Sequence, residues 1–446
     1  MSPLNIAVVG SGISGLSCAW LLSKRHKVTV FERDTRLGGH SNTIETESAD
    51  GPVAIDTGFI VYNEVTYPNL TALFEHLGVQ SARSNMSFAV SLNAGSYEYS
   101  GSGISGLFGQ PSNLLNPRHL KLVFEILSFF RKATELNTNT CTADLTLAEW
   151  LKQSGYSEDF AQRHILPMGA AIWSVPAAQM MDFPVAAFAR FFQNHGLLKV
   201  RNRPKWRTVI GGSRNYVNKL AADFSGTLRV GLEVCKIRRV NAGVDIMTKD
   251  GAVESFDHCV LATHADQTLS ILEDADALEQ RHLSAFKYSQ NEAVLHVDSC
   301  AMPKRSRLWS SWNYVSTKPE DSPTVTYWMN CLQPLATKQN YFVTLNPMTP
   351  IENTRTIGRY LYAHPVFNAT ALAQQQHLWA LQGRRRTWFA GSYFGYGFHE
   401  DGLQAGLAVA ETLGGVSRPW QVDGQSDRLQ FTPGSAPNDL FLEAAQ

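Results

Sequence analysis

The sequence predicts an α/β fold with a parallel sheet near its N-terminus, and three observations lead to this prediction. A short apolar run, "NIAVV" (Asn5–Val9), is followed by the glycine-rich turn "GSGISG" (Gly10–Gly15). The next segment, "LSCAWLLSK", has the composition of a helix. "KVTVFER" (Lys27–Arg33) then has the pattern of a second buried strand. Strand, turn, helix and strand in this order are typical of the βαβ unit of a parallel sheet.

The turn has the composition of a phosphate-binding turn. Gly10 allows the sharp change of direction, Gly12 lets backbone N–H groups approach a pyrophosphate, and Gly15 lets helix and strand pack closely. The helix that follows the turn directs free N–H groups and partial positive charge toward the same place, and Ile13 and Ser14 within the turn are expected to contact the cofactor as well. The turn is therefore expected to bind a dinucleotide.

An acidic residue ends the second strand. Glu32 follows the first glycine by about 20 residues, the spacing at which a carboxylate reaches the ribose hydroxyls of a bound dinucleotide. Its charge repels a 2′-phosphate, which disfavours NADP. The whole segment predicts a Rossmann-like domain.

The same hexapeptide occurs a second time at Gly101–Gly106, where its neighbours differ. "SYEYS" before it does not have the pattern of a buried strand, and Pro111 and Pro117 follow it. Because proline disfavours a helix interior, we expect no helix directly after this copy. The second copy is predicted to be a flexible loop.

The residues after Glu32 distinguish between dinucleotides. "ERDTRLGGHSNT" resembles the FAD-binding signature of the flavin amine oxidoreductase superfamily, which includes monoamine oxidases, protoporphyrinogen oxidase and phytoene desaturases. The resemblance implies an FAD-binding domain of the glutathione-reductase type with an inserted α+β substrate domain. It also implies that Arg33, Arg36, Gly38 and Gly39 lie close to the pyrophosphate and the flavin.

Two later segments resemble the same superfamily. In "GLEVCKIRRV" and "CVLATHA", Val234 is expected to meet the adenine through its backbone, and Ala262–Thr263 forms the turn that follows a strand. "RTWFAGSYFGYGFHEDGLQAGLAVAETL" resembles the C-terminal segment that holds the flavin. The residues that it implies at the flavin are Gly391, Asp401, Gly402 and Leu403, and Ser392 stands at a cofactor position where relatives often carry an acid.

Several strings resemble a narrower bacterial group of flavoproteins, often labelled flavin-containing amine oxidases. They include "PMGAAIWSVP", "RFFQNHGLL", "WRTVIGGSRNYV" and "GYGFHEDGL". Members of this group are often encoded beside lipid methyltransferases, which implies work on acyl lipids. The leading hypothesis is an FAD-dependent oxidoreductase that removes hydride from an apolar substrate, for example by desaturating a methylated fatty acyl chain.

Three positions depart from the superfamily pattern. Amine oxidases usually carry a lysine near the flavin, but Gln290–Asn291 occupies the expected strand position and Lys287 is out of register. His40 stands where an arginine usually follows the glycine pair. The C-terminal segment contains no cysteine for a thioether link, so FAD is expected to be bound non-covalently.

The catalytic candidates are two aromatic and two ionisable residues. Trp173 and Tyr396 lie in the strings shared with the narrower group. Hydride transfer to a flavin needs a water-poor pocket, and aromatic side chains of this kind can line one. His399 or Glu400 could accept a proton as hydride leaves. Equally, Glu400 and Asp401 could serve only to cap the last helix.

Two alternative functions remain open at this point. One is an amine oxidase that produces aldehyde and hydrogen peroxide, and the other is a flavin-binding redox sensor without turnover. The electron acceptor is not specified by the sequence.

The composition limits the classes of partner that the protein is expected to bind. The formal net charge is +0, which gives no electrostatic case for nucleic acid. Neither a targeting segment nor an apolar run long enough to cross a bilayer is visible, so we expect a cytoplasmic protein with at most peripheral membrane contact. The six cysteines are scattered, and no metal-binding cluster is readable.

The chain is expected to form two domains from interleaved segments. Residues 1–83, 204–284 and 387–415 are predicted to form the FAD-binding domain. Residues 84–203 and 285–386 are predicted to form the substrate domain, and residues 416–446 a peripheral C-terminal tail. Within the substrate domain, Thr146 and Glu149 fit a capping box.

Overall fold

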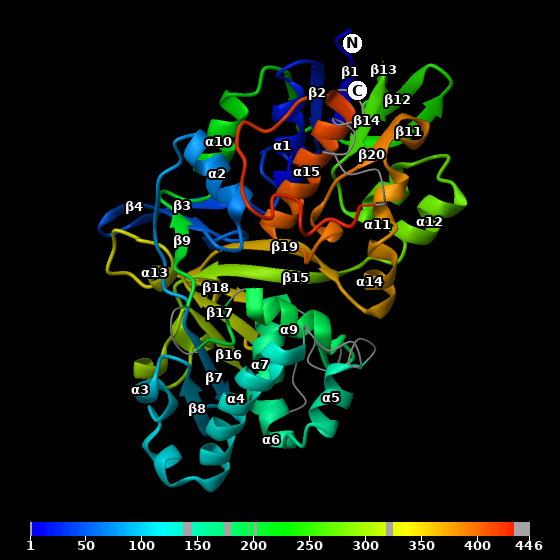
Figure 1. The fold of residues 1–446 in the computed structure, drawn as a ribbon. Helices are drawn as coiled ribbons and strands as arrows, with labels where there is room; N and C mark the ends of the chain where they lie inside the picture. The colour runs from blue at the N-terminus through cyan, green and yellow to red at the C-terminus, as the bar shows by residue number, and fades with distance from the viewer. Residues whose placement is uncertain are drawn as a thin grey trace.

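The computed structural model describes residues 2–136, 145–173, 180–194, 196–199, 203–317 and 324–431. Figure 1 shows two layered halves, each organised around a sheet. The upper half contains both ends of the described chain, and the lower half contains the helices of residues 117–194. Among the described residues, no helix has the length and apolarity that a bilayer-spanning segment needs.

A five-stranded parallel sheet forms the centre of the upper half. Its strand order is β10-β2-β1-β14-β20. The bounds are Asn5–Val9 (β1), Lys27–Glu32 (β2), Thr227–Val230 (β10), His258–Leu261 (β14) and Thr387–Phe389 (β20). The central strand is apolar because both its faces are covered, and Val8 pairs with Val30 on one side and Val260 on the other. The predicted α/β fold with a Rossmann-like sheet is confirmed.

The strands of this sheet come from far apart in the chain. β1 and β2 precede residue 83, β10 and β14 lie within 204–284, and β20 begins at Thr387. Helices α1 (Ile13–Leu22) and α15 (His399–Gly414) lie beside the sheet, and a three-stranded meander lies on its other side (Figure 1). The meander consists of β11 (Val234–Val240), β12 (Gly243–Thr248) and β13 (Val253–Phe256).

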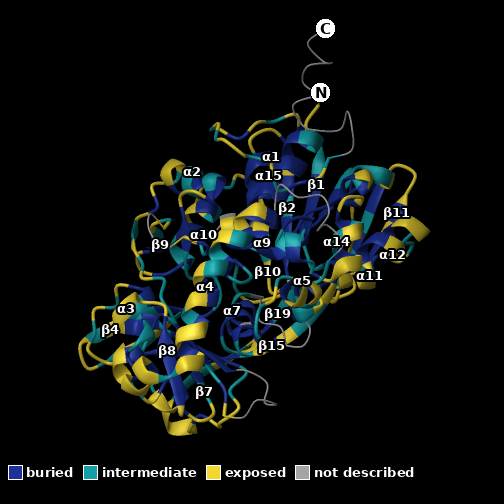
Figure 2. Cartoon of the chain, turned by 60° about the horizontal axis from the view of Figure 1, so that its bottom comes forward, coloured by how far each residue is buried: buried dark blue, intermediate teal, exposed yellow. Residues whose placement is uncertain are grey.

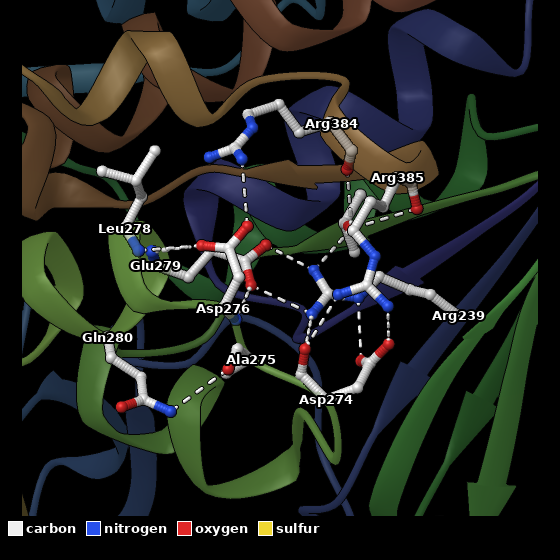
Figure 3. A network of polar contacts seen from close by, with 10 residues as sticks. Arg239, Asp274, Ala275, Asp276, Leu278, Glu279, Gln280, Arg384 and Arg385 are labelled. Carbon is white, nitrogen blue, oxygen red and sulfur yellow. Dashed lines mark hydrogen bonds and ion pairs between the residues drawn. The ribbon is translucent and has the colours of Figure 1, made fainter.

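An ion-pair network ties the meander to the C-terminal strand (Figure 3). The guanidinium of Arg239 in β11 is 2% exposed and forms an ion pair with the fully buried Glu279 of α12 (Ala277–Leu283). Its Nε donates to Asp274 at 2.8 Å, and it also donates to Thr387 Oγ1 at 3.3 Å. Removal of one partner would leave an uncompensated buried charge, which costs about 3–5 kcal/mol.

A seven-stranded sheet forms the centre of the lower half. Its order is β19-β15-β18-β17-β16-β7-β8, antiparallel except where β16 meets β7. The bounds are Phe88–Leu92 (β7), Tyr97–Ser100 (β8), Lys287–His296 (β15), Trp312–Val315 (β16), Thr324–Trp328 (β17), Phe342–Leu345 (β18) and Thr356–Val366 (β19). These strands come from residues 84–203 and 285–386, which matches the interleaving expected for the second domain; the domain bounds remain a prediction.

Helices cover this second sheet. They include α4 (Pro117–Glu135), α5 (Leu147–Gln153), α7 (Leu166–Trp173) and α9 (Val185–Asn194). The predicted capping box is confirmed at the start of α5, where Thr146 Oγ1 accepts from the backbone N–H of Glu149 at 3.2 Å. Ring contacts such as Phe188 on Phe192, 4.1 Å between centroids, fill the space between helices.

The second copy of the glycine hexapeptide differs from its prediction. Tyr97–Ser100 is a fully buried strand, β8, and a one-turn helix, α3 (Ile104–Leu107), follows at once. Both features were expected to be absent. The strand is buried because β8 packs its tyrosines against His119 and His164, and the prolines fall beyond α3. The strand is an edge strand paired antiparallel with β7, so the segment is not a second βαβ unit.

Two arginines connect the segment after α15 to charges of the last helix. Arg418 is 6% exposed and forms an ion pair with Glu411 at 2.7 Å. Arg428 forms an ion pair with the fully buried Asp401 at 2.9 Å. These ion pairs attach the segment at two points, whereas most of residues 416–431 are half-buried or exposed, and the peripheral tail stays a prediction.

Candidate functional site

The glycine turn between β1 and α1 leaves open space where a phosphate is expected. Gly10 adopts a φ of +100°, and a Cβ there would lie 2.8 Å from the carbonyl oxygen of Ala262. A Cβ on Gly15 would lie 1.9 Å from the oxygen of Gly10. By contrast, nothing lies within 4 Å of a Cβ built on Gly12. Gly10 and Gly15 are required by the fold itself, whereas Gly12 faces an open cradle at the N-terminus of a helix.

The carboxylate of Glu32 lies beside this turn. One oxygen accepts from the backbone N–H of Ser11 at 2.9 Å, and the other accepts from the N–H of Asp34 at 2.9 Å. These contacts hold the side chain at the carboxyl end of β2, where parallel-sheet proteins bind their ligands.

The glycine pair of the FAD-like signature folds back onto the turn. The N–H of Gly38 donates to the oxygen of Ser11 at 3.0 Å, and a Cβ on Gly39 would lie 3.2 Å from Gly12 Cα. The guanidinium of Arg36 donates to the oxygen of Gly39 at 2.7 Å. Arg36 thus braces the loop that closes over the cradle.

The C-terminal glycine segment meets the same turn. A Cβ on Gly402 would lie 2.7 Å from Ser14 Oγ, and a Cβ on Gly406 would lie 2.2 Å from the oxygen of Ser14. Small residues on both helices therefore allow α15 to lie directly against α1 (Figure 1). This packing brings the N-termini of two helices to one cavity.

That cavity has a volume of about 1280 Å³ and runs from the turn into the lower half of the molecule. Its polar end is lined by residues expected at a cofactor: Gly10, Gly12, Ile13, Ser14, Glu32, Arg33, Arg36, Gly38, Gly39, His40, Val234, Ala262, Thr263, Gly391 and Ser392. Its other end is lined mainly by apolar side chains: Phe88, Leu107, Ile126, Leu127, Phe130, Met168, Ala171, Ile172, Phe191, Trp312, Tyr327 and Leu345.

Four histidines line the middle of the cavity and form what we call the histidine cluster: His40, His264, His364 and His399. The rings of His40 and His364 have centroids 5.6 Å apart. Burial lowers the pKa of His40 to about 4 and the pKa values of the other three to about 3. The cluster is therefore uncharged at neutral pH.

His399 is held by neighbours from the N-terminal part and the middle of the chain. Its Nε2 contacts Tyr216 Oη at 2.8 Å and Ser41 Oγ at 3.0 Å. Its ring stacks on Phe59. An uncharged imidazole in this position can accept a proton from a group in the cavity.

Glu400 does not line the cavity. Its carboxylate accepts from the backbone N–H groups of Asn69 and Leu70 at 3.1 and 2.9 Å, which caps α2 (Pro68–His76). Burial raises the pKa of Glu400. Asp401 instead caps its own helix by accepting from the N–H of Phe398 at 2.7 Å. Of the two readings of these carboxylates, the geometry favours capping, although Glu400 caps a different helix from the one expected.

The structure also places the remaining sequence candidates. Tyr396 lines the cavity, whereas Gly15, Asp401, Gly402 and Leu403 lie behind its wall. Trp173 ends α7, and its side chain lies outside the described part of the chain. Within the described residues there is no group of histidine, cysteine or carboxylate side chains arranged to hold a metal ion.

Sequence reasoning missed two histidines of the cluster. His264 follows Ala262–Thr263 directly, so extending that motif by one residue would have found it. His364 lies on β19, in no motif, and reaches the cavity only through the pairing of β19 with β15. Gln290, the position examined for a lysine, lines the cavity, and Lys287 does not.

Comparisons with known proteins agree with this architecture. A putative flavin-containing monoamine oxidase of Mycobacterium tuberculosis, AofH, is 25% identical over 269 residues, which are 56% of this chain and 55% of that protein. The match thus spans about half the length of the curated relative. Cyclohexylamine oxidase of Brevibacterium oxydans IH-35A superposes with a TM-score of 0.69 at 16% identity, over 92% of this chain and 99% of that one.

A fatty acid isomerase of P. acnes that produces CLA superposes with a TM-score of 0.66 at 15% identity, over 90% of this chain and 97% of that one. At these identities the two structures establish the fold alone. The family described as flavin containing amine oxidoreductase matches residues 13–340, which is most of the chain. The chain therefore belongs to the flavin-containing amine oxidoreductase family.

Proposed function

We propose that the protein is an FAD-dependent oxidoreductase that removes hydride from an apolar substrate, with a fatty acyl chain as the leading candidate. The observation that carries the proposal is the single cavity that joins the Gly10–Gly15 turn to an apolar chamber. FAD is a long molecule. Its pyrophosphate would lie at the turn while its flavin ring reaches the apolar chamber. When bound, it would supply the acceptor for the hydride.

The residues present fit a non-covalently held FAD. Gly12 and the N-terminus of α1 would take the pyrophosphate, since the cradle there is open and carries free N–H groups. Glu32 would accept hydrogen bonds from the ribose. The N-terminus of α15, together with Gly391 and Ser392, would face the flavin end.

The chamber favours a long uncharged substrate. Among the described lining residues the only carboxylates are Glu32, Asp34 and Glu233, and all three lie at the nucleotide end. An ammonium group in the chamber would therefore have no counter-ion, and its burial would cost free energy. An acyl chain needs none, because apolar side chains and excluded water provide the affinity.

Desaturation requires that one carbon lose hydride and its neighbour lose a proton. The uncharged imidazole of His399 is the residue that we propose accepts this proton. Tyr216 and Ser41 fix its ring, and the stacked ring of Phe59 keeps water from its face.

The test combines spectroscopy with lipid analysis. Purified protein should show the visible absorption of bound flavin that is released by acid as FAD, and acyl lipids should bleach it under anaerobic conditions. Lipid mass spectrometry of cells with and without the protein should then identify the unsaturated product. Protein that never carries flavin when FAD is supplied would contradict the proposal.

Amine oxidation is the second candidate function, favoured by the family and by the name of the M. tuberculosis relative. A peroxide-coupled screen of mono- and polyamines distinguishes it. Peroxide formation with an amine, without bleaching by lipids, would replace the acyl-chain proposal.

A further inference from the structure

The helix α4 is apolar on two opposite faces. One face, which includes Leu122, Ile126 and Phe129, is buried in the lower half of the molecule. The other face carries Leu120, Phe124 and Leu127, which follow each other at the spacing of one helix face. These three side chains are 47%, 71% and 53% exposed.

The apolar surface continues into the neighbouring segments. The 3₁₀ turn η1 (Pro111–Leu115) leads directly into α4, and its Leu114 and Leu115 are 56% and 89% exposed. Ile104, at the start of α3, is 79% exposed. We call Ile104, Leu114, Leu115, Leu120, Phe124 and Leu127 the apolar rim. Figure 2 shows exposed residues along α4 and beside α3. A cluster of this kind marks an interaction surface.

The apolar rim adjoins the cavity. Leu127 is both part of the rim and part of the cavity wall. The exposed loop Gly101–Gly103 and Leu107, on either side of Ile104, also line the cavity. The second glycine hexapeptide, which has no role in the cofactor site, thus lies where the cavity meets the rim.

The charges on α4 complement an anionic surface. Arg118, Lys121 and Arg131 are exposed, and the only exposed carboxylate of the helix is Glu135, at its far end. Glu125 is buried, accepts hydrogen bonds from Ser157 and lies 4.0 Å from Lys121 Nζ, whose side chain is nevertheless 63% exposed. The chain as a whole has a net charge of +0, so this cationic bias is local. Exposed leucine and phenylalanine flanked by lysine and arginine are the composition of an interfacial helix.

We propose that the apolar rim and the cations of α4 form a docking surface for an anionic lipid bilayer, which places the cavity mouth at the membrane. Docking itself goes beyond the proposed function. Its purpose, the delivery of an acyl chain into the chamber without passage through water, rests on that function.

Vesicle flotation tests docking without any turnover. The flavin-loaded protein should float with vesicles of phosphatidylcholine mixed with phosphatidylglycerol, and much less with phosphatidylcholine alone. Leu115→Glu and Phe124→Glu should each lower the vesicle partition coefficient at least about tenfold, because a charge would replace an inserted side chain. Arg118→Gln and Lys121→Gln should lower it by about fivefold each at low salt.

The matched control is Val65→Glu. Val65 is 72% exposed but precedes α2, in the other half of the molecule (Figure 1). Because all of these side chains point into solvent, the variants should retain the flavin spectrum and the melting temperature of the wild type.

Three outcomes would overturn the proposal. They are a wild-type protein that does not float, Phe124→Glu and Val65→Glu variants that float alike, and a Phe124→Glu variant that turns a vesicle-free dimer into a monomer. The last would make the rim an interface between copies. Failure of docking would leave flavin content and lipid oxidation in detergent unchanged, so it is distinguishable from failure of the proposed function.

Discussion

The ring of His399 stacks on the ring of Phe59, with centroids 3.7 Å apart and planes inclined by 10°. Phe59 lies shortly after strand β4 (Gly51–Asp56), and His399 begins the last long helix. The contact therefore joins two segments that are separated by most of the chain, and it fixes the ring of a catalytic candidate that, like Tyr396, lines the cavity.

The low pKa values of the histidine cluster predict acid sensitivity. Each imidazole takes up a proton near pH 6.5 when the chain is unfolded but only near pH 3–4 when it is folded. Their stabilising contribution is therefore full above pH 6.5 and is lost as the pH falls toward 4. Asp56, whose pKa burial raises to about 6, acts in the opposite direction. The melting temperature should fall between pH 6.5 and 4, and less steeply in His364→Asn; equal slopes would contradict this assignment.

Gly12→Ala separates cofactor binding from folding. The backbone φ of −63° suits alanine, and the added Cβ meets nothing within 4 Å. The unfolding free energy of the cofactor-free protein should change by less than about 0.5 kcal/mol. Flavin affinity should fall roughly 10- to 100-fold, because the methyl group keeps phosphate oxygens from the N–H groups. Flavin titration by fluorescence quenching measures this affinity. An unchanged affinity would contradict the placement of the phosphate at this turn.

Gly406→Ala should destabilise the fold without weakening flavin binding directly. Its Cβ would lie 2.2 Å from a backbone oxygen of α1, so one helix must move. We expect a loss of about 1–3 kcal/mol in unfolding free energy. Flavin should be lost only in proportion to the unfolded fraction. Denaturant titration of the cofactor-free protein provides the measurement, with Gly12→Ala as a comparison at a glycine whose Cβ has free space and whose φ of −63° suits alanine.

Glu400→Gln tests whether this carboxylate is structural. The amide loses one acceptor of the α2 cap, which should cost about 1–3 kcal/mol of stability. Turnover per bound flavin should be unchanged, since the side chain does not line the cavity. His399→Gln should show the opposite pattern, with a lower kcat and a nearly unchanged melting temperature. A loss of kcat in Glu400→Gln at full flavin content would restore its catalytic role.

Ala171→Leu tests the apolar chamber. Ala171, on α7, is buried and lines the apolar chamber. A leucine side chain there would extend into the chamber and leave less room for a long substrate. The ratio of kcat/KM between long and short acyl substrates should fall about tenfold. Competition assays with a mixture of chain lengths measure the ratio directly. An unchanged ratio would place the substrate elsewhere.

Local patterns carried most of the fold. The βαβ unit, the strand ends at Val9 and Glu32, and the capping box at Thr146 each depend on neighbours in sequence, and each is confirmed. The buried strand at Tyr97–Ser100 was missed, because its burial comes from a helix and a histidine that lie later in the chain.

Residues of the site could be predicted only where they belong to a local sequence motif. The glycines of the turn were found because their spacing follows from backbone geometry. The capping of α2 by Glu400 was not found, since its partners Asn69 and Leu70 are more than 300 residues away in the sequence. His364 enters the histidine cluster only after β15 and β19 have paired.

The direct contact of Gly402 and Gly406 with Ser14 has a consequence for biosynthesis. Helix α1 completes its packing only when α15, which follows it by most of the described chain, has been translated. A nascent chain that ends before α15 lacks the helix that packs against Ser14 and Ser17. We therefore expect such a truncated chain not to retain a flavin.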